Sequence, residues 1–460
     1  LLERTLVVDG AGAAWAECSD PTDPEEQLLV ESDGVGPHHE LVVRGLRADS
    51  RYQCVVHLDG RSSAATFATG RPPVPAFEVT DPAGASEPYT LFNTQRGATS
   101  VDGTWLLIVD PDGAVRWSYL VGFDLIGDVD AELEDEGQTV HLGGGWGWFD
   151  VDQPNRGVFR DVDLSGQTLL DRTEPAFGLG FNHHSEKLDD GSYLSLTGAE
   201  NTDGVTTWYG VGIEQWHPEA GLQWTWSSQQ LVDAGVVAPP EPTEKLPFHA
   251  NSVSFVDDAW GSAVWVSLYG ARQIWRLDRA TGDRTHVFGP EGDLTLLDPQ
   301  GAPLGPEQWS WVQHDPDYGP DGSILLYDNG QDRPVDVPYS RVAEFAVDLD
   351  ARTATLLWDW TEPGWYDPVL GDADWLPNGD VLVTRGFRVG WTPDSPDVSQ
   401  VLELRPPRDG AAAEVVWRLR WTDPDWPTFR AARYDGCALF ANARYCPAVA
   451  ARLRALRGEP

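Results

Sequence analysis

Short apolar runs recur along the whole chain, and turn residues separate them. Residues 193–196 (YLSL), 324–327 (ILLY) and 381–384 (VLVT) are three of these runs. Each follows a turn built on Asp-Gly or Asn-Gly, which are strong hairpin signals because the turn needs a positive φ. The pattern predicts β-strands joined by hairpins, and a helical signal appears only at 447–457.

One pattern repeats from about residue 85 to residue 422. Each copy has an Asp-Gly-like turn, an apolar strand, and a later strand that often carries Trp, as at 222–226 (LQWTW) and 356–360 (LLWDW). Successive copies begin roughly 40–60 residues apart, the range of propeller blades. We therefore predict an all-β protein with a six-bladed β-propeller over 76–435, which would carry the active site along its axis. One large sandwich is the minor alternative.

Residues 1–75 differ from the repeats. The segments 39–46 and 51–58 alternate between apolar and polar residues, and Tyr52 stands two residues before Cys54, the spacing of a tyrosine corner. The Gly-Leu and Tyr spacing resembles the fibronectin type III pattern. We predict a small β-sandwich over 1–75 that is structural or serves in docking. The tail, 436–460, is predicted to hold a short helix.

Composition narrows the environment and the partners. The net charge is −41, from 73 acidic and 32 basic residues, which disfavours nucleic acid and anionic membranes as partners. No apolar run approaches the roughly 20 residues of a membrane-spanning helix. The chain has no Met and opens with Leu-Leu-Glu-Arg, which indicates a mature or trimmed exported protein, periplasmic, extracellular or at the outer surface. The sequence leaves the oligomeric state open.

The cysteines fall in two local pairs, Cys18 with Cys54 and Cys437 with Cys446. Neither pair has the spacing of a zinc site. Two disulfides in an oxidising compartment are expected, but four cysteines allow three pairings and the sequence does not choose among them.

Three histidines occupy corresponding places in three copies of the repeat. They are His184 in NHHS (182–185), His249 in HANS (249–252) and His314 in QHD (313–315). Propeller blades would bring these positions to one central cavity, where convergent titratable rings indicate chemistry. A neutral imidazole is a nucleophile and a proton carrier near pH 7. We predict that all three are catalytic, the alternative being structural, hydrogen-bonded rings.

These motifs resemble the bacterial arylsulfotransferase family. The resemblance rests on HANSV at 249–253, on QHD at 313–315 followed by LLYDNG at 325–330, and on LPNGD at 376–380. It covers most of 85–435 and implies a propeller behind a small sandwich. It also implies an exported enzyme that transfers a sulfuryl group from one phenol to another by a ping-pong reaction, with small aromatic substrates and without a cofactor.

The resemblance assigns roles to individual residues. It implies His314 as the transiently sulfated nucleophile and His184 and His249 as further active-site histidines, with His183 as a substitute for His184. The family carries an Arg shortly after the HANS strand, where this chain has Tyr269. The candidates for substrate binding in addition to His183 are Tyr269, Asn251, Arg272, Arg341 and Arg385, and the three arginines are candidates for the missing cation.

Two alternatives remain open at this point. The first is a metalloenzyme in which His184, His249 and His314 hold one transition metal such as zinc or copper. Asp315, Asn251 or Asp372 would then hydrogen-bond to the ligands, and an Arg would not be needed. The second is a non-catalytic, secreted ligand-binding propeller, since one fold hosts many functions.

Overall fold

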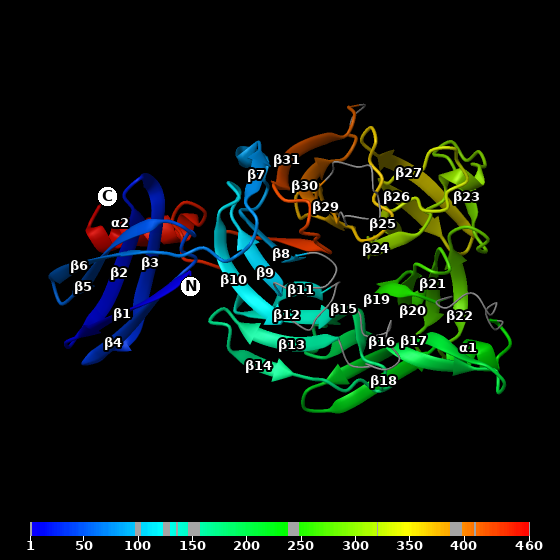
Figure 1. The fold of residues 1–460 in the computed structure, drawn as a ribbon, viewed down its shortest axis with the longest axis horizontal. Coiled ribbons are helices and arrows are strands. Elements are labelled where there is room, and N and C mark those ends of the chain that lie inside the picture. The colour runs from blue at the N-terminus through cyan, green and yellow to red at the C-terminus, as the bar shows by residue number, and fades with distance from the viewer. Residues whose placement is uncertain are drawn as a thin grey trace.

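The computed structural model describes residues 2–96, 103–122, 129–134, 137–145, 157–237, 248–319, 321–386, 398–408 and 411–459. The described chain is nearly all β and forms many small sheets (Figure 1), which confirms the predicted class. Its α-helices are α1 (Gln229–Asp233) and α2 (Pro447–Arg457). Neither of these helices is long and apolar enough to cross a membrane.

Two sheets form from the N-terminal residues. One pairs two antiparallel strands, and the other has the order β3-β2-β5-β6. Both sheets supply side chains to one core, for example Leu6 and Leu41 from the first and Ala16 and Leu28 from the second. The strands are β1 (Glu3–Asp9), β2 (Ala13–Asp20), β3 (Asp23–Val35), β4 (His38–Arg44), β5 (Arg51–Leu58) and β6 (Arg61–Ala68).

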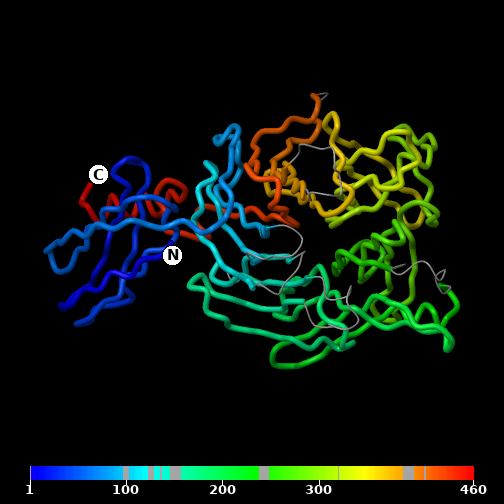
Figure 2. Tube along the Cα trace, in the orientation of Figure 1, coloured from blue at the N-terminus to red at the C-terminus, as the bar shows by residue number. Residues whose placement is uncertain are grey.

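Six further sheets follow within the described chain, and they succeed one another around a ring (Figures 1 and 2). Hydrogen-bonded neighbours in the ring are antiparallel except β23, which runs parallel to β27. The first three sheets comprise β8 (Tyr89–Gln95), β9 (Thr104–Val109), β10 (Val115–Gly122) and β32 (Ala431–Tyr434); β11 (Val129–Glu134), β12 (Thr139–Gly144), β13 (Val158–Asp163) and β14 (Thr168–Asp171); and β15 (Phe181–Lys187), β16 (Tyr193–Thr202), β17 (Thr207–His217) and β18 (Gly221–Ser227).

The remaining three sheets complete the ring. They comprise β19 (Ala250–Asp258), β20 (Gly261–Leu268), β21 (Gln273–Asp278) and β22 (Arg284–Phe288); β23 (Thr295–Leu297), β24 (Gln313–Tyr318), β25 (Ser323–Asp328), β26 (Arg341–Asp348) and β27 (Thr353–Trp360); and β28 (Asp372–Trp375), β29 (Val381–Arg385), β30 (Gln400–Arg405), β31 (Glu414–Trp421) and β7 (Phe77–Thr80). Both ends of the chain close the ring, because β7 pairs with β31 and β32 pairs with β8.

The repeated Trp residues lock neighbouring sheets together. The indole N–H of Trp117 donates to the carbonyl oxygen of Leu164 in the next sheet (2.9 Å), and that of Trp226 donates to Gly282 in the next sheet (2.9 Å). Trp417 of the last sheet donates to Pro111 of the first (3.1 Å). Each ring is also buried, so one residue supplies apolar area and satisfies a turn carbonyl.

Tyr52 connects the N-terminal sheets to the ring. Its hydroxyl accepts a hydrogen bond from the backbone N–H of Arg47 (2.9 Å) and donates to the carboxylate of Glu26 (2.9 Å). This is the backbone contact of a tyrosine corner. Glu26 also forms a fully buried ion pair with Arg116 of β10. Burial opposes ionisation, but the guanidinium of Arg116 holds the pKa of Glu26 below its ordinary value.

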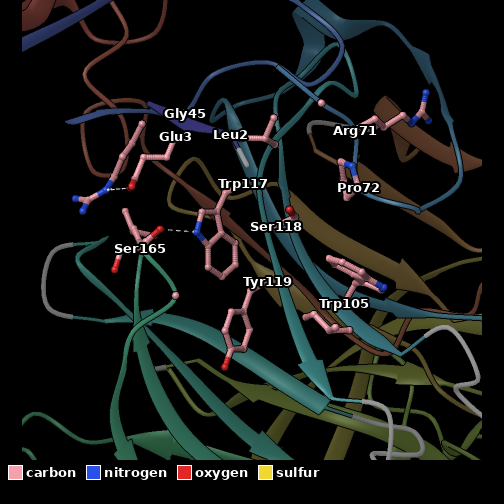
Figure 3. Close-up of a pocket in the computed structure, with 15 residues that line it drawn as sticks. Leu2, Glu3, Gly45, Arg71, Pro72, Trp105, Trp117, Ser118, Tyr119 and Ser165 are labelled. Atoms are coloured by element: carbon pink, nitrogen blue, oxygen red, sulfur yellow. Dashed lines mark hydrogen bonds and ion pairs between the residues drawn. The ribbon is translucent and has the colours of Figure 1, made fainter. Parts of the chain in front are cut away.

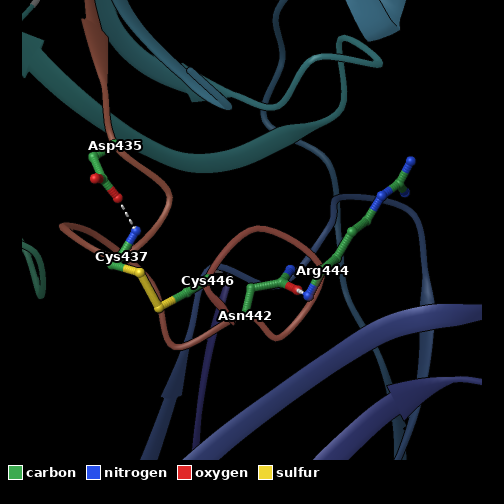
Figure 4. The surroundings of a disulfide bond; sticks show 5 residues. All are labelled: Asp435, Cys437, Asn442, Arg444 and Cys446. Atoms are coloured by element: carbon green, nitrogen blue, oxygen red, sulfur yellow. Dashed lines mark hydrogen bonds between the residues drawn. A yellow bond between two sulfur atoms is a disulfide. The ribbon is translucent and has the colours of Figure 1, made fainter. Parts of the chain in front are cut away.

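The C-terminal tail returns to the N-terminal sheets (Figure 1). Arg452 and Arg457 of α2 pair with Glu31 and Glu17. The disulfides are Cys18–Cys54, between β2 and β5, and Cys437–Cys446, which closes a short loop after β32 (Figure 4). The expectation of two disulfides is thus confirmed, and they fit an exported protein.

Candidate active site

The innermost strands of the ring carry the predicted histidines. Strands β15, β19 and β24 are neighbours at the centre of the ring. Two of them are irregular where a histidine lies: pairing of β15 breaks between Phe181 and Ser185, and pairing of β24 breaks between His314 and Asp317. His183 has a left-handed φ of 47°. Such bulges redirect side chains and are common next to active sites.

Three imidazoles gather with two aromatic rings in what we call the histidine cluster. Its members are His183, His249, His314, Tyr269 and Phe429. His249 Nε2 lies 3.2 Å from His183 Nε2, and the Tyr269 ring stands between His249 and His314, with centroid separations of 4.9 and 5.6 Å. Phe429 packs against His183 and His314. Residues far apart in the chain thus meet at one place.

Hydrogen bonding fixes the proton on His314. Its Nδ1 lies 2.6 Å from Oδ1 of Asn329. The Asn329 amide cannot be reversed, because its Nδ2 donates to the carbonyl oxygens of Asp367 (2.8 Å) and Leu370 (2.7 Å). Oδ1 is therefore an acceptor, and Nδ1 of His314 carries the hydrogen. In the neutral ring the lone pair is then on Nε2, the nitrogen that a nucleophilic imidazole uses.

His183 and His249 form a hydrogen-bonded pair of imidazoles. Nδ1 of His183 hydrogen-bonds to Oδ1 of Asn182, so its Nε2 is the acceptor of the contact with Nε2–H of His249. Burial, and then the nearby rings of His183 and His314, lower the pKa of His249 well below its ordinary value. His249 is therefore neutral near pH 7, and the pair can pass a proton between two nitrogens.

His184 lies outside the histidine cluster. Its Nδ1 accepts a hydrogen bond from the backbone N–H of Val253 (3.0 Å), and its Nε2 faces Asp130 at 3.4 Å. Burial and the charge of Arg430 lower the pKa of His184 to about 3. The structure thus brings His249 and His314 together as predicted from the repeat, but with His183 rather than His184. The irregularity of β15 is the reason: between Phe181 and Ser185 this strand advances four residues against two on β16, and the left-handed φ of His183 interrupts the alternation of side chains between the two faces.

The three candidate arginines are engaged elsewhere. Arg272 is half exposed and pairs with Asp332 (2.8 Å). Arg341 is fully buried between Asp328 and Asp359. Arg385 contacts Asp367 at 3.1 Å, and the backbone carbonyl of Asp367 in turn accepts a hydrogen bond from Asn329, the partner of His314.

The other two predicted binding residues have different surroundings. Tyr269 lies in the histidine cluster, where its hydroxyl donates to Gln331. Asn251 is fully buried and donates to the backbone of Gln313 (2.8 Å), so it holds β19 against β24. Asn251 therefore positions the neighbour of His314 rather than lying among the imidazoles.

Two groups of described side chains have the spacing of metal ligands: Asp130, Glu132 and His184, and Asp315, Asp372 and Asp374. His249 and His314 belong to neither group, and His184 stands with the carboxylates. The set His184, His249 and His314, which the metalloenzyme alternative requires, is therefore not brought together.

A cavity of about 490 Å³ lies away from the histidine cluster (Figure 3). It is formed between the N-terminal sheets and the first two sheets of the ring, and Trp105, Trp117 and Tyr119 line it. Of its charged residues, Glu3 and Arg44 pair with each other (2.7 Å), and Arg71 pairs with Asp49 (3.7 Å). None of the described residues around it is a histidine, so this cavity is not the candidate active site.

Sequence reasoning missed two residues of the site. Asn329 stands in the Asp-Asn-Gly motif, which by itself predicts no role for it. Its place one hairpin after the Gln-His-Asp motif is the signal that could have linked it to His314. Phe429 lies just before β32, the strand that closes the ring of sheets, and its backbone N–H donates to Oδ1 of Asn93 (2.9 Å). Only chain closure brings that segment to His183 and His314.

Comparison with known proteins adds one decisive match. The family described as Arylsulfotransferase (ASST) matches residues 85–419. No curated protein matches the chain.

Solved structures resemble the chain only remotely. They include a quinonprotein alcohol dehydrogenase-like protein from Bacteroides thetaiotaomicron (12% identity, 94% of each chain, TM-score 0.37) and the periplasmic gluconolactonase PpgL from Pseudomonas aeruginosa (13% identity, 74% of this chain and 99% of that one, TM-score 0.34). Hsv2 from Kluyveromyces lactis is another (9% identity, 87% and 97%, TM-score 0.33). These structures are too remote to support a functional comparison. The family match spans most of the ring, and the chain therefore belongs to the arylsulfotransferase family.

Proposed function

We propose that this protein transfers a sulfuryl group from an aryl sulfate to a phenol through a sulfated His314. In the first step Nε2 of His314 attacks sulfur, the bond between sulfur and the aryl oxygen breaks, and a phenol leaves. In the second step the oxygen of an acceptor phenol attacks sulfur, the S–N bond breaks, and His314 is regenerated. No cofactor is required in either step.

His183 and His249 handle the proton in this proposal. The leaving phenolate takes a proton from the pair, and the acceptor phenol later returns one. Without substrate the pair is neutral near pH 7, and a bound sulfonate brings negative charge next to it, which favours uptake of a proton. In the substrate complex the protonated pair then supplies the positive charge that the family places on an arginine, at the position where this chain has Tyr269.

Tyr269 and Phe429 are proposed to hold the phenol. Both rings pack against His314 or the other histidines, with centroid distances of 4.9 to 6.4 Å. Aromatic rings prefer stacked or edge-on contacts with one another, so the two side chains would contact the ring of a bound phenol in these geometries. The acceptor and the donor are accordingly small aromatic molecules.

The proposal extends to the architecture. We propose that the six ring sheets are the blades of a six-bladed propeller over 76–435, and that residues 1–75 form a fibronectin-like sandwich, with the tail, 436–460, packed on it. Successive antiparallel sheets and closure by β7 and β32 support the first assignment. The protein is exported to an oxidising compartment, which the two disulfides support.

The observation that carries the function is the Asn329 hydrogen bond, because it places the lone pair of His314 on Nε2. The test mixes the protein with 4-nitrophenyl sulfate and a panel of phenols, and follows 4-nitrophenol release. Wild type is expected to give a burst of product and an acid-labile sulfuryl adduct on the His314 peptide by mass spectrometry.

Two variants complete the test. His314→Ala is expected to lose both the adduct and the transfer, whereas His38→Ala, which alters an exposed histidine paired with Asp9, keeps both. Transfer by folded His314→Ala, or no transfer by folded wild type with any phenol, would contradict the proposal.

A further inference from the structure

Acidic side chains gather on the inner strands, beside the histidine cluster. Asp315 lies on β24, directly after His314, and Asp372 and Asp374 lie on the neighbouring strand β28. One carboxylate oxygen from each lies within 4.8 Å of the others. A calcium ion that binds oxygens at about 2.4 Å spans such separations.

These carboxylates are short of positive charge. Arg430 contacts Asp130 at 2.6 Å and Asp315 at 2.8 Å, and its charge also acts on Asp372 and Asp374. One guanidinium thus faces four carboxylates. Burial, and then mutual repulsion, raise the pKa values of Asp372 and Asp374 well above their ordinary range, and that of Asp315 is raised mainly by burial.

Asp372 gives a second, independent indication of a ligand. Its side chain is only 2% exposed, and its Oδ1 has no hydrogen-bond donor within the described part of the chain; the side chains that it approaches are the carboxylates of Asp315 and Asp374. Asp315, Asp372 and Asp374 line a cavity of about 240 Å³. A buried carboxylate oxygen without a partner costs free energy, and a bound cation would remove that cost.

We propose that Asp315, Asp372 and Asp374 form a binding site for a hard divalent cation, of which Ca²⁺ is the best fit. The donors are all carboxylate oxygens, which suit Ca²⁺, Mg²⁺ or Mn²⁺ and not zinc or copper. The second group, Asp130, Glu132 and His184, is less suitable. Nδ1 of His184 accepts a backbone hydrogen bond, so its Nε2 carries the hydrogen and does not offer a lone pair to a metal.

The bound cation would join two strands that no hydrogen-bonded sheet joins, since β24 and β28 belong to different sheets. Asp315 has a positive φ of 39° and lies in the bulge that follows His314. The cation would therefore hold the irregular backbone next to the proposed nucleophile. This inference concerns binding alone and does not rest on the proposed sulfuryl transfer.

The test uses the whole protein, dialysed against EDTA, without substrate. Trp375 lines the same cavity, so Tb³⁺, which replaces Ca²⁺, should show luminescence sensitised by this indole. Calorimetry with Ca²⁺ should give about one equivalent, and Ca²⁺ should raise the melting temperature. Binding should weaken as pH falls, because protons compete for the carboxylates.

Four variants locate the site. Asp372→Asn and Asp374→Asn should each weaken Ca²⁺ binding at least about tenfold, as the loss of a metal-site group usually does. Asp317→Asn is the matched control, because Asp317 is also a buried acid on β24 but lies outside the group of three. Trp375→Phe should keep Ca²⁺ binding and lose most of the luminescence. Folding of each variant is checked by circular dichroism.

Each outcome decides the matter. One equivalent of Ca²⁺ that is lost in Asp372→Asn or Asp374→Asn and kept in Asp317→Asn supports the site. No Ca²⁺ or Tb³⁺ binding by folded wild type overturns it. Binding that survives in both ligand variants places the ion elsewhere and also overturns it.

Discussion

Replacing Asn329 by Ala tests whether its side chain sets the tautomer of His314. The substitution removes the acceptor of the Nδ1–H hydrogen bond (2.6 Å). In the proposed attack of His314 on sulfur, the imidazole ring gains positive charge, and this bond becomes one to a charged donor, worth about 1.5–3 kcal/mol. At about 1.4 kcal/mol per tenfold, the first chemical step should slow by roughly 10- to 150-fold.

The same change has a separate cost in stability. The carbonyl oxygen of Leu370 loses its donor, whereas that of Asp367 keeps a contact with the Ser340 hydroxyl at 3.3 Å. One buried carbonyl is thus orphaned, and the free energy of unfolding should fall by about 1–3 kcal/mol. Asn201→Ala is the matched control, because Asn201 is equally buried and hydrogen-bonded to Ser228 but lies away from the histidines.

The assay measures the burst of 4-nitrophenol in a stopped-flow instrument, at saturating donor, with urea unfolding in parallel. We expect Asn329→Ala to lower the burst rate with little change in the apparent affinity for the donor. Asn201→Ala should lose stability and keep the rate. A folded Asn329→Ala protein with a burst rate within about twofold of wild type would refute the tautomer argument.

Three further predictions follow from the surrounding groups. His183→Gln should lower the rate of sulfuryl transfer about 100-fold by removing proton handling. His184→Gln should instead lower the melting temperature and change that rate less than tenfold. Equal rate losses would contradict the assignment of the proton-handling role to His183. Burial raises the pKa of Glu186 from 4.5 to about 8, so between these values the folded state holds a proton that the unfolded state has released, and the free energy of unfolding should fall as pH rises. Glu186→Gln, unfolded in urea with EDTA at pH 5 and pH 8, should reduce that fall by up to roughly 4 kcal/mol, and an unchanged pH dependence would count against it. Tyr52→Phe should lower the free energy of unfolding by about 1–3 kcal/mol, because it orphans the backbone N–H of Arg47; a neutral result in urea melts would rule this out.

The local pattern was sufficient for the fold class. Apolar runs with Asp-Gly and Asn-Gly turns indicated strands, because side-chain alternation and positive φ are local requirements. The tyrosine-corner spacing of Tyr52 and the grouping of the cysteines were visible in the sequence for the same reason. The pairing Cys18–Cys54 was not, since it depends on β2 and β5 being adjacent.

The site was only partly visible. The sequence identified His249 and His314 through their motifs, but it placed His184 where the structure has His183. A bulge adds residues to one strand without changing the hydrophobic pattern, so the face on which each histidine lies could not be read from spacing.

The sequence by itself determined the strands, the recurring Trp residues and the motifs of an arylsulfotransferase. The tertiary structure alone decided which of them meet. Phe429 reaches the imidazoles because β32 closes the ring, and Asn329 fixes the tautomer of His314 across a hairpin. Asp315 and Asp372 lie together where carboxylates outnumber cations, for the same physical reason. Electrostatic and hydrogen-bond contacts act through space between residues far apart in the chain, and the local sequence sets only the strands that carry these residues.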